Sequence, residues 1–145
     1  MKQHILLIDD DKDELGIFMD ALMLVPHDDG FKCTYAPSAT QASKMLKLLV
    51  PDFIFVDFNM PVMNGLEFIK FTTRQPHLKN TKLCLYATTI DEQIKKIAED
   101  FGADCIKKPL TIKELAESLS EILVADPQPD YSFSPERNYW EAAYL

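Results

Sequence analysis

Short runs of consecutive apolar residues, each the length of a β-strand, recur along this chain and constrain its fold most strongly. Residues 5–8 and 53–56 contain no polar side chain, and each run ends directly in an aspartate. A strand that is apolar at every position is typical of a parallel sheet covered on both faces. Residues 83–87 form a third such run, and residues 31–36 and 105–106 are weaker strand candidates. We therefore expect a buried, parallel sheet.

Apolar residues at three- and four-residue spacing lie between these runs and predict helices. Ser38 is a predicted N-cap, and Thr111 with Glu114 is a predicted capping box. Gly102 is expected to end the fourth helix in the C′ position. Strand–helix pairs of this spacing imply right-handed crossovers and hence a doubly wound α/β domain. The predicted helices cover residues 15–23, 38–49, 63–73, 90–101 and 111–123.

The composition excludes several classes of binding protein. The 145 residues include 15 lysines and arginines against 23 aspartates and glutamates, a net charge of −8. A surface for duplex nucleic acid needs clustered basic residues, so we expect no direct nucleic-acid binding. Only 4 glycines are present and no glycine-rich phosphate loop occurs, which argues against dinucleotide and P-loop chemistry.

The cysteines and the N-terminal residues predict the compartment. The 3 cysteines are far apart and favour neither a disulfide framework nor a zinc site. The first apolar run is too short for a signal sequence or a membrane span. We therefore expect a cytoplasmic protein with no membrane contact.

Aspartates follow two of the predicted strands. Asp9, Asp10 and Asp11 come directly after the first run, and Asp57 after the run at 53–56. Sites in such sheets lie at the carboxyl ends of the strands, so these carboxylates are expected to converge. Their mutual repulsion calls for a hard divalent cation, and Mg²⁺ prefers such oxygen ligands.

A carboxylate in this position can act as a nucleophile toward a phosphoryl group. Lys108, at the end of the last predicted strand, would neutralise charge on the phosphoryl oxygens. Taken singly, each feature has a simpler explanation: the first aspartates as helix caps or solvated groups, Asp57 as a strand end, and Lys108-Pro109 as a helix entry. These explanations weaken jointly, because all three features fall at the same edge of the sheet.

The segments 5–11 (ILLIDDD), 55–65 (FVDFNMPVMNG) and 102–109 (GADCIKKP) together resemble the receiver domain of bacterial two-component response regulators. The resemblance runs from about residue 3 to residue 124 and is most specific in the segment 55–65. It implies a flavodoxin-like (βα)5 fold with strand order 2-1-3-4-5 and helices on both faces.

The resemblance also implies a role for each site residue. Asp57 is the expected phosphoacceptor. Asp9, Asp10, Asp57 and the backbone carbonyl of Asn59 are the expected Mg²⁺ ligands, and Lys108 is expected to contact the phosphoryl group. Asp11, the third aspartate of the run, is expected to cap the following helix. Pro61, Gly65 and Pro109 are expected to be structural.

Two positions depart from the family pattern. A serine or threonine is expected thirty positions after the phosphoacceptor, but counting from Asp57 leads to Ala87. Thr88 follows at once, and a register shift of one residue would let it contact the phosphoryl group. An aromatic residue often precedes the lysine by three positions, where this chain has Cys105. The usual coupled motion of hydroxyl and ring is therefore in doubt.

We divide the chain into a receiver domain, residues 1–125, and a tail, residues 126–145. The tail contains three prolines but also several aromatic residues, in which disordered linkers are usually poor. Our hypothesis is that Tyr139 and Trp140 dock on the receiver itself or on a partner, and a floppy end is the alternative. The aromatic residues of the tail are Tyr131, Phe133, Tyr139, Trp140 and Tyr144.

The expected function is that of a stand-alone, single-domain response regulator similar to the chemotaxis type. It would accept a phosphoryl group from a histidine kinase or phosphotransfer protein and signal by contacting a downstream protein, with homodimerisation left open. It would not act on an external metabolite.

Two alternatives remain. A receiver that no longer switches would be a constitutive interaction module, as Ala87 and Cys105 suggest. A phosphohydrolase with an aspartyl nucleophile is less favoured, because Asn59 stands where a second carboxylate would be needed as general acid.

Overall fold

Five parallel strands in the order β2-β1-β3-β4-β5 form the central sheet of this computed structural model, which describes residues 2–124. This strand order, and the alternation of strands with helices, confirm the predicted flavodoxin-like doubly wound fold. The strands are β1 (Gln3–Ile8), β2 (Phe31–Ala36), β3 (Phe53–Val56), β4 (Lys82–Ala87) and β5 (Asp104–Lys107). The helices are α1 (Asp13–Leu22), α2 (Ala39–Met45), α3 (Gly65–Thr73), α4 (Glu92–Asp100) and α5 (Ile112–Leu123), with a 3-10 turn at Pro76–Leu78.

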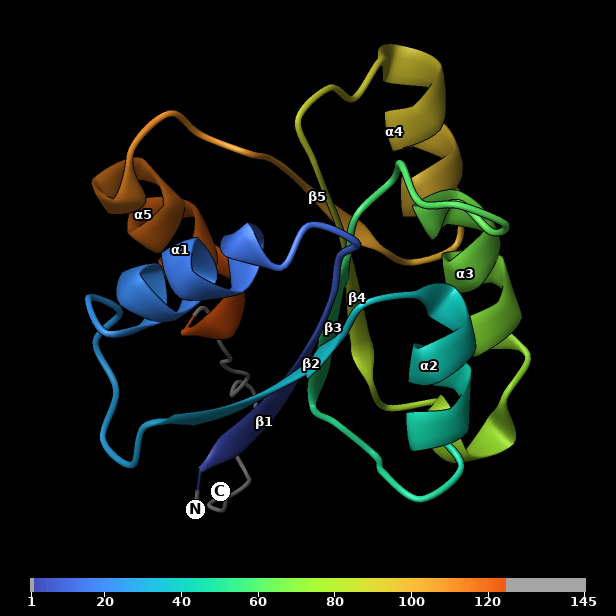
Figure 1. Ribbon diagram of the computed structural model, residues 1–145, viewed down its shortest axis with the longest axis horizontal. Helices are drawn as coiled ribbons and strands as arrows, with labels where there is room; N and C mark the ends of the chain where they lie inside the picture. The colour runs from blue at the N-terminus through green and yellow to red at the C-terminus, as the bar shows by residue number, and fades with distance from the viewer. Residues whose placement is uncertain (1, 125–145) are drawn as a thin grey trace, which may run out of the picture.

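Helices cover both faces of the sheet (Figure 1). The pair α1 and α5 lies against one face, and α2, α3 and α4 lie against the other. The side chains of β1 alternate between the two cores: Ile5 and Leu7 pack with the α1 and α5 side, and Leu6 and Ile8 with the opposite side. All four are fully buried, because a strand between two helical layers has no exposed face.

Three helices are shorter than the sequence predicts. The chain leaves α2 after Met45 through tight turns, in which Lys47 N–H donates to the Lys44 carbonyl at 3.3 Å and Leu48 N–H to that of Met45 at 3.0 Å. Leu48 lies in these turns and is 96% exposed. The apolar residues that predicted a helix to residue 49 therefore extend beyond the helix itself. Helix α4 begins at Glu92 rather than at residue 90, capped by the Asp91 side chain.

Helix α3 begins two residues later than predicted. Asn64 caps it, and its side chain accepts from Glu67 N–H at 2.8 Å while the Glu67 carboxylate accepts from Asn64 N–H at 2.9 Å. This capping box was missed in the sequence. The predicted cap at Ser38 is confirmed, and at Thr111 the hydroxyl accepts from Glu114 N–H at 3.1 Å.

Gly102 ends α4 with a positive φ of 82°, as predicted. The docking hypothesis for Tyr139 and Trp140, and the boundary at residue 125, lie outside the described residues. Within the part of the chain that is described, no helix is long and apolar enough to cross a membrane.

Candidate functional site

The carboxylates at the strand ends converge at the carboxyl edge of the sheet. Backbone bonds continue the sheet ladder there, from Asp9 N–H to the Ala36 carbonyl at 3.1 Å and from Asp57 N–H to the Ile8 carbonyl at 2.9 Å. Asp9 is fully buried and Asp57 is 7% exposed, whereas Asp10 is exposed. One carboxylate oxygen from each aspartate lies within 4.8 Å of the other two.

The loop after β1 is held by its own side chains. Asp9 Oδ1 accepts from Asp11 N–H at 2.9 Å, and Asp11 Oδ1 accepts from Asp13 N–H at 3.0 Å. Asp11 therefore satisfies a backbone donor at the start of α1, although Lys12 occupies the N-cap position. These bonds leave one Asp9 oxygen to face the site.

Lys108 brings an ammonium group to the carboxylates. It follows β5 directly, and its backbone N–H donates to the Ala87 carbonyl at 2.8 Å. Its Nζ lies 2.7 Å from Asp9 Oδ2 and 3.5 Å from Asp57 Oδ1. Burial acts to lower the pKa of Lys108, but the hydrogen bond to Asp9 and the two negative charges outweigh it and raise that pKa.

The negative charge of Asp57 is disfavoured, because the side chain is buried beside other carboxylates. Burial and the neighbouring Asp9 raise the pKa of Asp57 to about 6, although Lys108 acts to lower it. Lys108 is shared between Asp9 and Asp57, so it compensates only part of their combined negative charge. At neutral pH Asp57 is still ionised, and its oxygen is available as a nucleophile.

The donor set fits a hard divalent cation. Asp9, Asp10 and Asp57 offer only carboxylate oxygens, which Mg²⁺, Mn²⁺ and Ca²⁺ accept. Only Asp10 is exposed, so a cation would enter from its side. Asn59 lies in the turn beyond Asp57 with an exposed side chain, and its carbonyl as a ligand stays a prediction.

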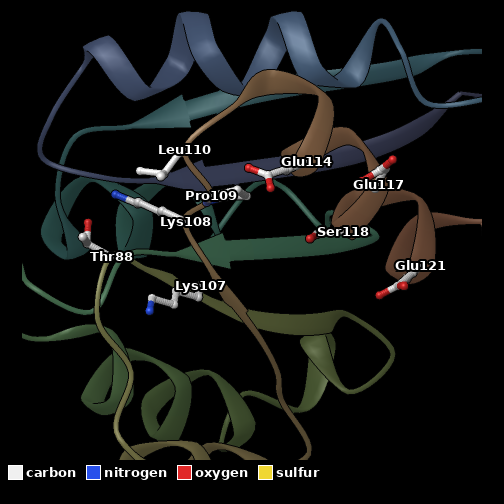
Figure 2. A pocket seen from close by; sticks show the side chains of 9 residues that line it. All are labelled: Thr88, Lys107, Lys108, Pro109, Leu110, Glu114, Glu117, Ser118 and Glu121. Atoms are coloured by element: carbon white, nitrogen blue, oxygen red, sulfur yellow. The ribbon is translucent and has the colours of Figure 1, made fainter.

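At the end of β4 the residue beside the site is Ala87. It is the last residue of the strand, fully buried, and opposite Lys107 in the register. Thr88 is exposed and lines a groove beside α5. Figure 2 shows Thr88 and the two lysines on one side of this groove and Glu117 and Glu121 on the other. Contact between Thr88 and a phosphoryl group stays a prediction.

The loop between β3 and α3 packs tightly on the acceptor. Gly65 N–H donates to the Phe58 carbonyl at 2.9 Å. A Cβ atom at Gly65 would overlap the Asp57 carbonyl oxygen and lie 2.9 Å from Leu85 Cδ1. Earlier in the loop Met63 N–H donates to the Pro61 carbonyl at 2.8 Å. The absence of a side chain at residue 65 thus lets the loop fold back on Asp57.

Sequence reasoning missed two tyrosines at the site. The Tyr35 hydroxyl donates to the Asp9 carbonyl at 2.6 Å, and the Tyr86 hydroxyl donates to Glu14 Oε1 at 3.1 Å. Burial and the charge of Glu14 raise the pKa of Tyr86 far above its usual value, so it stays a neutral donor. A buried tyrosine hydroxyl needs a hydrogen-bond partner. A tyrosine inside a predicted buried strand is therefore the sequence signal that points to a hydrogen bond of this kind.

A cluster of three carboxylates, two of them buried, lies beside one lysine at the carboxyl edge of a doubly wound sheet. This arrangement defines a domain of the phosphoacceptor class. The chain belongs to the response regulator receiver domain family, whose model matches residues 5–120.

Members of this family are similar to the present protein over most of its chain. The probable chemotaxis protein CheY of Rhizobium etli is 26% identical over 126 residues, which cover 86% of this chain and 95% of that protein. The chemotaxis response regulator CheY4 of Vibrio cholerae, known from a high-resolution structure, is 25% identical with a TM-score of 0.72, and the match covers 84% of this chain and 99% of that one. The Mn(2+)-bound form of response regulator Rcp1 has the same fold, with a TM-score of 0.69 at 20% identity over 83% of this chain and 91% of that one.

Other curated relatives are longer, and the chain spans 35% or 48% of their length. Membership of the receiver domain family places the chain in two-component signalling.

Proposed function

We propose that this chain accepts a phosphoryl group on Asp57, in a Mg²⁺-dependent reaction, from a histidine kinase or a phosphotransfer protein. The observation that carries the proposal is the position of Lys108 Nζ, 3.5 Å from Asp57 Oδ1 and 2.7 Å from Asp9 Oδ2, the two buried carboxylates of the cluster. The phosphorylated protein then signals through contacts with a downstream protein. The free thiols of the described cysteines favour the cytoplasm as the compartment.

The chemistry follows from the residues at the site. An Asp57 oxygen attacks phosphorus, and the O–P bond forms as the P–N bond to the donor histidine breaks and the imidazole keeps the electron pair. Asp9, Asp10 and Asp57 would hold the cation, which would neutralise phosphoryl oxygens and orient them. Lys108 supplies the second positive charge to those oxygens.

The signal arises from the charge that is added. A phosphoryl group brings roughly −1.5 to −2 charges to this edge of the sheet. Lys108 is now closer to Asp9 than to Asp57, so a new anion on Asp57 competes for its ammonium group. A shift of Lys108 toward Asp57 would alter the contacts of the segment that joins β5 to α5.

The test is chemical. The full chain is incubated with a small-molecule phosphodonor, with and without Mg²⁺, and its intact mass is followed. We expect a phosphoryl adduct that needs Mg²⁺ and is absent from Asp57→Asn. Asp100→Asn makes the same chemical change at an exposed position of α4 and should leave the adduct intact.

A constitutive interaction module is the second candidate, favoured by Ala87 at the end of β4 and by Cys105 in β5. It predicts no adduct under conditions that label a control receiver. That result would overturn the phosphoacceptor proposal.

A further inference from the structure

Tyr86 has an unusual place beside the site. It is the last residue but one of β4, and its side chain is only 1% exposed. The face of its ring is turned to Lys108, whose Nζ lies 5.0 Å from the ring centroid. A cation over an aromatic face is attracted by the ring quadrupole, and more strongly when the pair is desolvated.

The ring is fixed from two other sides. Its hydroxyl donates to Glu14 Oε1 at 3.1 Å, and Glu14 belongs to the first turn of α1. Phe18, one turn further along α1, contacts the ring edge to face with centroids 5.8 Å apart. Tyr86 therefore connects the lysine to helix α1.

Lys108 needs such a support in this chain. Its ammonium group is shared unequally between Asp9 and Asp57, and it must remain near both when the charge on Asp57 changes. Ala87 offers only a methyl group at the end of β4, and Cys105 offers no ring in β5. The Tyr86 ring is the aromatic group that the structure places against the Lys108 ammonium.

We propose that Tyr86 is a positioning residue for Lys108: its ring holds the ammonium group over the carboxylates, and its bond to Glu14 fixes the ring. This inference rests on the proposed phosphoacceptor function. It assigns to Tyr86 and Glu14 a role in the transfer step, and it makes α1 the helix that is connected to the lysine.

Three variants of the full chain test the proposal. Tyr86→Leu removes the ring, and Tyr86→Phe keeps the ring and removes the hydroxyl. Val25→Ala, the control, removes apolar volume from the same core beyond the end of α1. The first readout is the phosphorylation rate at saturating phosphodonor and Mg²⁺. The second is the NMR shift of the Lys108 Cε methylene group, which the ring current of Tyr86 displaces and which needs no phosphorylation.

We expect Tyr86→Leu to lower the saturated rate by about 3- to 30-fold, the range of a cation–π contact. Tyr86→Phe should lower the rate less than Tyr86→Leu does. Val25→Ala should keep the wild-type rate although its thermal midpoint falls. The Lys108 Cε shift should move toward the random-coil value in Tyr86→Leu and stay displaced in the other two variants.

Equal rate losses in Tyr86→Leu and Val25→Ala would show a merely structural role and overturn the proposal. An unchanged Lys108 shift in Tyr86→Leu would overturn it as well. If the wild-type chain takes up no phosphoryl group, the proposed function fails. The Lys108 shift then still decides whether the ring positions the lysine.

Discussion

Asp57 must carry its charge in a place that solvates it poorly. Its pKa rises from the usual 3.8 to about 6 because of burial and Asp9. The folded state therefore holds this proton more tightly than the unfolded state does. In the absence of divalent cations, the contribution of Asp57 to stability is most favourable below about pH 4 and is lost as pH rises through about 6.

We expect Asp57→Asn to be more stable than the wild type at pH 7.5 in the presence of a chelator, by up to about 3 kcal/mol. The difference should shrink as pH falls and vanish near pH 4, because both side chains are then neutral. Urea unfolding of the two proteins at several pH values measures it. A difference that does not change with pH would contradict the raised pKa of Asp57.

Val62 is strained in the loop that follows the acceptor. Its φ is 74°, the only positive φ of a non-glycine among the described residues, and it is 98% exposed. A β-branched residue in this conformation costs about 1–2 kcal/mol, whereas asparagine tolerates it. We expect Val62→Asn to raise the free energy of unfolding by about 1 kcal/mol. Val50→Asn, also exposed but without a positive φ, should bring no gain in the same denaturation experiment.

At the scale of elements, the start of α3 depends on a missing side chain. Gly65→Ala would push the loop away from the Asp57 carbonyl, so we expect a loss of about 1–3 kcal/mol in stability together with slower phosphorylation. Gly16→Ala is the matched control, since a Cβ atom in α1 meets nothing within 4 Å. That variant should gain about 0.5–1 kcal/mol from helix propensity. Thermal denaturation of both variants compares them, and a Gly65→Ala protein as stable as the wild type would refute the close packing.

Elements were predictable where local signals were strong. The apolar runs identified β1, β3 and β4, because a covered strand is apolar on both faces. The edge strands β2 and β5 are only partly buried, and they were the weaker candidates. Helix starts were less predictable, since the apolar pattern begins before the cap: Ile90 and Met63 continue the stripe, but Asp91 and Asn64 begin the helices.

The site, too, was predictable only in part. The sequence indicated which strand ends bear carboxylates and where Lys108 lies. It did not indicate the partner of a buried hydroxyl, because Tyr86 and Glu14 are 72 residues apart and are brought together only by the packing of α1 on the sheet.

At the scale of the whole molecule, a cation should stabilise the fold by relieving the repulsion between strand ends. At one hundred times its dissociation constant, Mg²⁺ should stabilise the chain by about 2.7 kcal/mol and raise the thermal midpoint on the order of 10 °C. Asp10→Asn removes an exposed ligand outside the Lys108 ion pairs, and it should lose most of this shift. Equal shifts in both proteins would place the cation elsewhere.

The ion pair between Lys108 and Asp9 joins residues that are 99 positions apart. On a ribosome, the last of the three carboxylates is made 51 residues before the lysine, an interval of roughly 3 to 10 seconds at ordinary synthesis rates. During that time the nascent chain holds the acceptor without its counter-charge. The acceptor site is therefore completed only when the final strand joins the sheet and Lys108 reaches Asp9.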